Sequence, residues 1–139
     1  MNSVATHGLT FLAGIAVGAA GTYFGDLFTD QRRRHAEDRK ARELFADMVG
    51  RMTDLLREMR ADLMEPDHRN VREFFVVPEV AQMTLGSKAF VYRDNGTNDY
   101  LAKVQILEAS GYVSDTTLGS APKFRMSEEF VSRLEQWAG

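Results

Sequence analysis

The sequence predicts a mainly helical protein with a small β component, arranged in three consecutive parts. Its first 25 residues contain no Asp, Glu, Lys or Arg, whereas all 17 basic and all 20 acidic residues lie in the remaining 114. A highly charged stretch without proline follows, and the last part alternates short apolar runs with turn residues. We therefore expect a transmembrane anchor over residues 1–28, a charged helical stalk over residues 29–65 and a small α+β domain over residues 66–139.

The first part contains a run without charged side chains, residues 4–25. A helix needs about 20 apolar residues to cross the hydrocarbon layer, so the length fits a single-pass helix. A cleavable secretory signal would begin with basic residues, and residues 1–7 contain none. Glycines four positions apart let membrane helices approach closely, which predicts association between copies; the alternative is that these glycines are incidental. They are Gly14, Gly18, Gly21 and Gly25.

Basic residues cluster on one side of this run and predict its orientation. Arg32, Arg33 and Arg34 follow the run, and basic flanks stay on the cytoplasmic side of a membrane. We therefore expect the N-terminus outside, the rest of the chain in the cytoplasm, and a bacterial inner membrane as the location. The same arginines are placed to contact anionic lipid headgroups, at about 1 kcal/mol each.

The second part has the pattern of an amphipathic helix that ends before Pro66. Its apolar residues are spaced alternately by three and four positions, as in a coiled coil, which predicts self-association of the stalk. The pattern covers only about two heptads, and a helix that packs on its own domain would show the same stripe. The stripe consists of Phe45, Met48, Met52, Leu55 and Met59.

The third part begins with elements that are hard to assign. Residues 68–77 fit either a helix or a buried strand, and residues 79–85 fit a short helix closed by Gly86. Residues 89–92 fit a short strand, and the Asn95-Gly96 pair that follows predicts a turn.

The remainder of this part has a clearer pattern. A helix is expected from Asn98 or Asp99 to about Ser110, closed by Gly111. Two strands are expected over residues 112–114 and 123–126, joined by the loop DTTLGSAP. Ser127, followed by two glutamates, predicts the start of a last helix.

The segments YLAKVQILEASGYVSD and KFRMSEEFVSRL resemble the second half of a winged-helix domain, over residues 98–137. In that family the helix before the glycine is the recognition helix, and the two strands form the wing. The resemblance therefore implies a winged-helix-like α+β domain. The other reading of the pattern is a small α+β domain of a different kind.

The charge of this part argues against nucleic acid as its partner. Residues 66–139 carry eight basic and ten acidic side chains, and affinity for nucleic acid comes largely from neutralised phosphates. A nearly neutral surface with aromatic residues is better suited to a protein partner. The residues proposed for such a partner surface are Tyr100, Lys103, Lys123 and Arg125.

The sequence contains no signature of catalysis. It has no cysteine, and its three histidines are His7, His35 and His68, which lie far apart without metal-ligand spacing. No phosphate-binding glycine loop and no nucleophile motif is present. We therefore expect no enzyme activity, no metal, no cofactor and no small-molecule substrate.

Together these patterns predict a non-enzymatic, membrane-anchored tether or scaffold that presents a small cytoplasmic protein-interaction domain. Its partner is an unidentified protein or another copy of the chain, bound through the anchor and the stalk. Two alternatives stay open: a membrane-attached regulator that binds nucleic acid, and an accessory subunit of a larger membrane complex.

Overall fold

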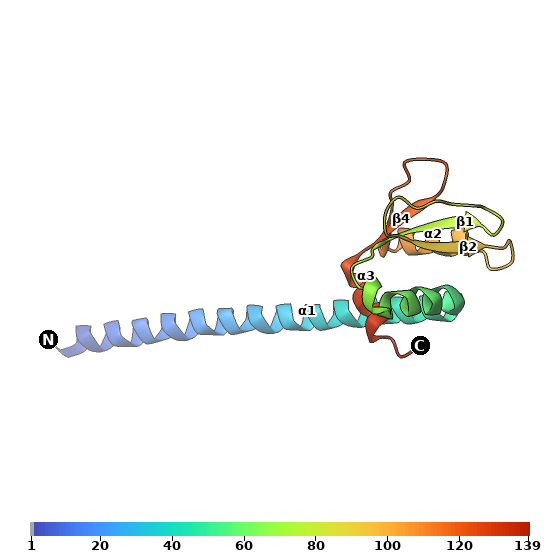
Figure 1. Cartoon of the computed structure of the whole chain (residues 1–139). Coiled ribbons are helices and arrows are strands. Elements are labelled where there is room, and N and C mark those ends of the chain that lie inside the picture. The colour runs from blue at the N-terminus through green and yellow to red at the C-terminus, as the bar shows by residue number, and fades with distance from the viewer. Residues whose placement is uncertain (1) are drawn as a thin grey trace. The chain divides into compact units, whose positions relative to one another are not determined.

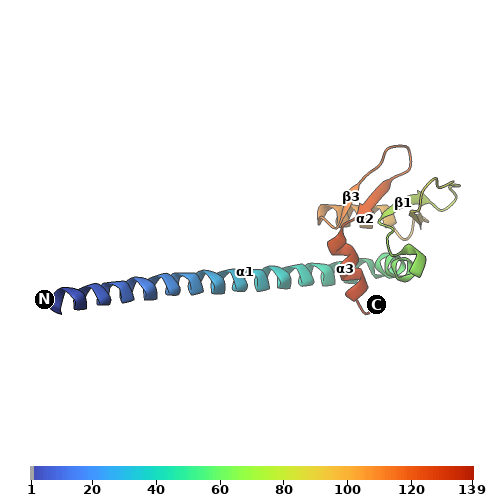
Figure 2. The same cartoon turned by 60° about the vertical axis from the view of Figure 1, so that its left-hand side comes forward.

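The computed structural model describes the backbone of residues 2–139 and the side chains of residues 25–139. The chain divides into two units, Met1–Ala46 and Asp47–Gly139, and each is described here by itself. Figures 1 and 2 show its elements, which comprise one long helix, a short 3-10 helix, four strands and two shorter helices.

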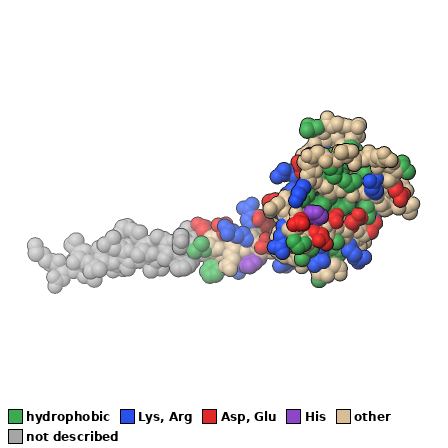
Figure 3. Space-filling model, viewed as in Figure 1, with side chains coloured by type: hydrophobic (Ala, Val, Ile, Leu, Met, Phe, Trp, Pro, Cys, Tyr) green, Lys and Arg blue, Asp and Glu red, His purple; other side chains and the backbone are tan. Residues whose placement is uncertain are grey.

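The first unit contains the beginning of helix α1, which runs from Asn2 to Met64. From residue 25 to residue 44 nearly all its side chains are exposed, as the mixed charged surface in Figure 3 shows. The Arg33 guanidinium forms an ion pair with the Glu37 carboxylate one turn later, at 3.1 Å. Pairs at this spacing stabilise an exposed helix by a few tenths of a kcal/mol, about 0.2–0.5 kcal/mol each.

The predicted transmembrane layout is corrected by the structure. Within the described side chains, residues 25–139, no helix is long and apolar enough to cross a membrane. Residues 26–65 carry nine basic and ten acidic side chains, and that density of charge excludes them from a hydrocarbon layer. The finding contradicts the single-pass anchor and the localisation derived from it; residues 1–24 of the predicted anchor lie outside the described side chains.

The second unit begins within α1, which bends at Met52. The backbone dihedral angles of Met52 (φ −138°, ψ 41°) are not helical, so α1 consists of two helical pieces. Gly50 weakens the helix just before the bend, and the Thr53 hydroxyl donates to the carbonyl of Val49. The bend places Met52 in the core, where its side chain is fully buried.

A four-stranded mixed sheet packs against this part of α1. Its strands are β1 (Glu73–Pro78), β2 (Phe90–Asp94), β3 (Val113–Asp115) and β4 (Lys123–Met126), in the order β2-β1-β4-β3. Strands β1 and β2 are parallel, whereas β4 is antiparallel to both β1 and β3.

Register and burial define one apolar face of this sheet. Phe74 lies opposite both Phe90 and Phe124, and Val76 lies opposite Tyr92. These five residues share one face, because alternate residues of a strand point to the same side of a sheet. All five side chains are buried. The ring of Phe74 stacks on that of Phe124 with centroids 5.6 Å apart. This face is therefore the side of the sheet that forms the core.

Two helices complete the core. Helix α2 (Tyr100–Ala109) buries Val104 and Leu107, and helix α3 (Glu128–Gln136) buries Phe130, Val131 and Leu134. The Ser127 side chain accepts a hydrogen bond from the Phe130 backbone at 3.2 Å, which confirms the predicted N-cap. Gly111 follows α2 with φ +78°, as expected of a glycine that closes a helix.

The predicted winged-helix fold is wrong. Between the 3-10 helix η1 (Pro66–His68) and α2 the chain forms the parallel strands β1 and β2 in place of the first helices of a winged-helix domain. The strand expected over residues 89–92 is confirmed as β2, and strand is the correct alternative for the end of residues 68–77. Residues 79–85, predicted as a short helix, contain no helix. Aromatic and β-branched residues favour strands here, because the alternate side chains of 74–77 and 90–92 fit one pleated, buried face. The sheet therefore has four strands and a parallel pair.

The predicted long stalk is not shown either. The structure divides the chain after Ala46, so residues 47–64 belong to the second unit and contribute its buried helix face. The predicted helix near residues 98–110, the two strands after it and the last helix are confirmed as α2, β3, β4 and α3.

Candidate functional site

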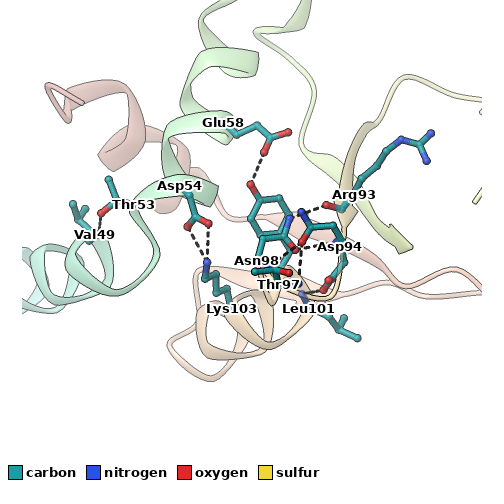
Figure 4. Close-up of polar contacts among 12 residues, drawn as sticks. Val49, Thr53, Asp54, Glu58, Arg93, Asp94, Thr97, Asn98, Leu101 and Lys103 are labelled. Carbon is teal, nitrogen blue, oxygen red and sulfur yellow. Dashed lines mark hydrogen bonds and ion pairs between the residues drawn. The ribbon is translucent and has the colours of Figure 1, made fainter. Parts of the chain in front are cut away.

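A cluster of polar side chains joins α1 to α2 (Figure 4). The Lys103 ammonium lies 2.8 and 2.9 Å from the two carboxylate oxygens of Asp54. The Tyr100 hydroxyl donates to a carboxylate oxygen of Glu58 at 2.8 Å. We call Asp54, Glu58, Tyr100 and Lys103 the helix clasp.

The protonation of the clasp follows from these contacts. Burial pushes the pKa of Asp54 upward, but the hydrogen bonds from Lys103 and from the Leu55 backbone, together with the charge of Lys103, outweigh it, so this pKa lies below its usual value. Burial and the Glu58 carboxylate raise the pKa of Tyr100 to about 12. At neutral pH the Asp54 carboxylate is therefore charged and can pair with the Lys103 ammonium, and the Tyr100 phenol is protonated and can donate to Glu58.

Backbone N–H groups in the turn before α2 and in its first turn also find acceptors within the chain. Asp94 accepts hydrogen bonds from the backbone N–H of Gly96 at 2.8 Å and of Leu101 at 3.2 Å. These backbone bonds, with that of Gly96 the largest cause, lower the pKa of Asp94. Asp99, at the N-cap position, has φ 49° and makes no capping bond with its side chain. Asp94 thus takes over the capping of α2 from five residues upstream of Asp99.

The four residues predicted as a partner surface lie in two places. Tyr100 and Lys103 belong to the helix clasp, where each contacts α1. Lys123 and Arg125 lie on β4, on the face of the sheet opposite the core, at 2.8 and 3.9 Å from Glu73. The structure does not bring all four together, and their role in binding a partner stays a prediction.

The stripe predicted for self-association is buried in the structure. Its five members, Phe45, Met48, Met52, Leu55 and Met59, each expose at most 9% of their surface. The last four belong to the second unit, where α1 packs on its own domain, as the alternative interpretation expected. Self-association through this stripe would require these side chains to leave their present environment.

The predicted membrane residues are only partly described. Gly14, Gly18 and Gly21 lie outside the described side chains, whereas Gly25 lies on α1 with open space around it. Arg32, Arg33 and Arg34 are exposed on the same helix.

An apolar groove lies at the end of the sheet where the parallel strands finish. Its volume is about 520 Å³, and its walls come from the ends of β1 and β2, the start of α2 and the loop before β4. Hydrophobic side chains dominate its lining, and Asp94 is its one charged member. The lining residues are Val76, Val77, Pro78, Asp94, Gly96, Leu101, Ser120 and Pro122.

Two apolar side chains project into solvent from the loops that line this groove. Val80 follows Pro78 by two residues and is 91% exposed, and Leu118 precedes Ser120 by two residues and is 97% exposed. In Figure 1 the loop before β4, orange-red in colour, stands at the top of the domain. We call the groove together with Val80 and Leu118 the apolar end.

The apolar end was not predicted from the sequence. A lone leucine inside the polar loop DTTLGSAP was a visible signal, because turn residues rarely need a large apolar neighbour. The groove itself had no such signal, since it depends on which loops meet at one end of the sheet.

Among the described residues, no group of three or more His, Asp or Glu side chains is placed to hold a metal ion. Comparison with known proteins found no matching family model, no matching curated protein and no matching solved structure. The geometry of the chain is therefore the basis for assigning a function.

Proposed function

We propose that the second unit is a non-enzymatic protein-binding module, and that the chain acts as an adaptor or scaffold. The partner would place apolar side chains in the groove and cover Val80 and Leu118. The observation that carries this proposal is the nearly complete exposure of these two side chains, each two residues away in sequence from a residue that lines an apolar groove. Burying an aliphatic side chain lowers the free energy by about 1.5–3 kcal/mol, so a partner that covers both would gain this free energy on binding.

The helix clasp is less suited than the apolar end to bind a partner. Its charged groups find their partners inside the chain, with hydrogen bonds of 2.8–2.9 Å. Groups that are already paired gain little from an external ligand, because binding would first have to break those bonds. Val80 and Leu118 at the apolar end are almost fully exposed, so a partner can cover these two side chains without breaking a hydrogen bond within the chain.

The proposal is tested with the variant Val80→Ser/Leu118→Ser of the full chain. Because both side chains are exposed, we expect the unfolding free energy to change by less than about 0.5 kcal/mol. Proteins cross-linked to the wild-type chain in cells, identified by mass spectrometry, should be lost from this variant. Each captured protein is then purified and its Kd measured, which should rise by at least about tenfold.

A matched control removes two half-exposed apolar side chains elsewhere, in the variant Met64→Ser/Ile106→Ser. This control should keep the partners. If both variants keep every partner with unchanged Kd, the apolar end is not the binding surface and the proposal is wrong. Capture of several proteins in fixed stoichiometry would identify the chain as an accessory subunit, the alternative suggested by the sequence.

A further inference from the structure

The three segments that surround the apolar groove carry charge of a single sign. They are residues 76–80, 94–101 and 115–122, and together they contain four acidic and no basic residues. The acidic residues are Glu79, Asp94, Asp99 and Asp115. The chain as a whole has 17 basic and 20 acidic residues, so this local imbalance is much larger than the average.

Two of these carboxylates are held in their charged form by the fold. Backbone N–H groups, first that of Gly96, lower the pKa of Asp94, and hydrogen bonds from Thr117 lower that of Asp115. Each therefore keeps its negative charge at neutral pH. Asp94 ends strand β2 and lines the groove, and Asp115 ends strand β3 at the start of the loop that contributes Ser120 and Pro122 to the lining.

Two basic residues directly adjoin these segments. Arg93 binds the loop that carries Val80 and offsets one of the four negative charges, which leaves an excess of three, whereas Lys123 is paired with Glu73. The Arg93 guanidinium donates to the backbone carbonyls of Glu79 at 3.0 Å and Ala81 at 2.7 Å, which fastens the loop after β1. The Lys123 ammonium lies 2.8 Å from the Glu73 carboxylate and 5.6 Å from the centre of the Phe75 ring. Lys123 thus points to the face of the sheet opposite the core.

We propose that the apolar end binds a protein segment in which apolar side chains are flanked by Lys or Arg. This inference rests on the proposed protein-binding function and adds the chemistry of the partner. The apolar side chains would fill the groove and cover Val80 and Leu118, while the basic residues would lie beside the surrounding carboxylates. Such opposite charges at the rim of an interface select partners and accelerate association more than they add affinity.

The test is selection of random dodecapeptides displayed on phage, with the full chain as target. The variant Val80→Ser/Leu118→Ser serves as counter-target, which removes peptides that bind elsewhere. We expect enriched peptides to contain at least two aliphatic or aromatic residues and at least two Lys or Arg, with few Asp or Glu. Their Kd should rise several-fold between 50 and 500 mM NaCl, because salt screens exposed charges.

A charge-removing variant keeps the shape of the loops while it tests the carboxylates. In Glu79→Gln/Asp99→Asn/Asp115→Asn the side chains remain hydrogen-bond acceptors, and asparagine tolerates the positive φ of residue 99. The Kd of the enriched peptides should rise by about tenfold. The matched control Asp67→Asn/Glu108→Gln/Glu135→Gln removes three exposed carboxylates elsewhere and should leave the Kd unchanged.

The outcomes separate this inference from the proposed function. Enriched peptides without a basic preference, or with a Kd unaffected by the charge-removing variant, would overturn the inference and leave the protein-binding function standing. Failure to enrich any peptide over the counter-target would count against both. If the full chain forms an oligomer that Val80→Ser/Leu118→Ser dissolves, the occupant is a second copy and the inference is wrong.

Discussion

The helix clasp and the apolar end lie on either side of the start of α2. They differ in whether their side chains find contacts within the chain. In the clasp, Lys103 and Tyr100 each meet a carboxylate of α1 at 2.8–2.9 Å. At the apolar end, Val80 and Leu118 are almost fully exposed. One region finds its partners within the chain, and the other leaves two large apolar side chains in water.

This difference separates what holds the domain together from what it offers to other molecules. Substitutions in the core or clasp should change the free energy of unfolding, whereas substitutions at the apolar end should change binding alone.

The largest effect is expected in the core below the clasp. Leu55 is fully buried on α1, so Leu55→Ala should reduce the free energy of unfolding by about 2–5 kcal/mol. The comparison variant Leu118→Ala removes the same atoms from an exposed position and should cost less than about 0.5 kcal/mol. Urea unfolding monitored by circular dichroism measures both. Equal losses would mean that Leu118 is not exposed and would remove the contrast.

The next effect concerns Asp94, which links the two regions. Asp94→Ala removes the acceptor for the backbone N–H groups of Gly96 and Leu101, so we expect a loss of about 1 kcal/mol and faster hydrogen exchange at the first turn of α2. Asp94→Asn retains an acceptor and should lose less. If both variants equal the wild type, Asp94 does not cap α2.

Two tyrosines on neighbouring elements sharpen the comparison further. The Tyr100 hydroxyl donates to Glu58, whereas the buried Tyr92 hydroxyl makes no well-aligned hydrogen bond among the described residues, although Asp62 lies near it. Tyr100→Phe should therefore cost about 1 kcal/mol, and Tyr92→Phe should be neutral or stabilising. Unfolding curves of the two variants decide this; the reverse order would show that the Tyr92–Asp62 contact is the stronger bond.

The smallest effect is the pH dependence of the Asp54–Lys103 pair. Because the pKa of Asp54 is lower in the folded protein than its ordinary value of 3.8, its contribution is complete above that value. The contribution is lost as the pH falls through the folded-state pKa. A double-mutant cycle with Asp54→Asn and Lys103→Met should give a coupling of about 0.2–1 kcal/mol at pH 7, decreasing in acid. Coupling that is independent of pH would contradict an ionic clasp.

Local sequence signals predicted the second half of the fold. Ser127 caps α3 and Gly111 closes α2, because these positions are determined by a few neighbouring residues. The heptad-like stripe with Met52 and Leu55 was a correct sign of an apolar helix face. What covers that face could not be read from the stripe, since a partner helix and the chain's own sheet require the same spacing.

The first half of the domain and the candidate site depend on contacts between distant residues. The run around Phe74 and Phe75 fits a helix or a strand locally, and only pairing with β2 and β4 decides between them. The resemblance to a winged helix failed for this reason. The groove joins Pro78 and Asp94, at the ends of β1 and β2, with Pro122 from the loop before β4, so its existence follows from the order of the strands.

Hydrogen–deuterium exchange of the full chain, with and without a peptide enriched by the selection or a captured partner, tests the central claim most directly. We expect the ligand to slow exchange in segments 76–80, 94–101 and 115–122, with no change in residues 54–58 of the clasp. Protection confined to the clasp or to the Lys123–Arg125 face of the sheet, with the three segments unchanged, would contradict the account.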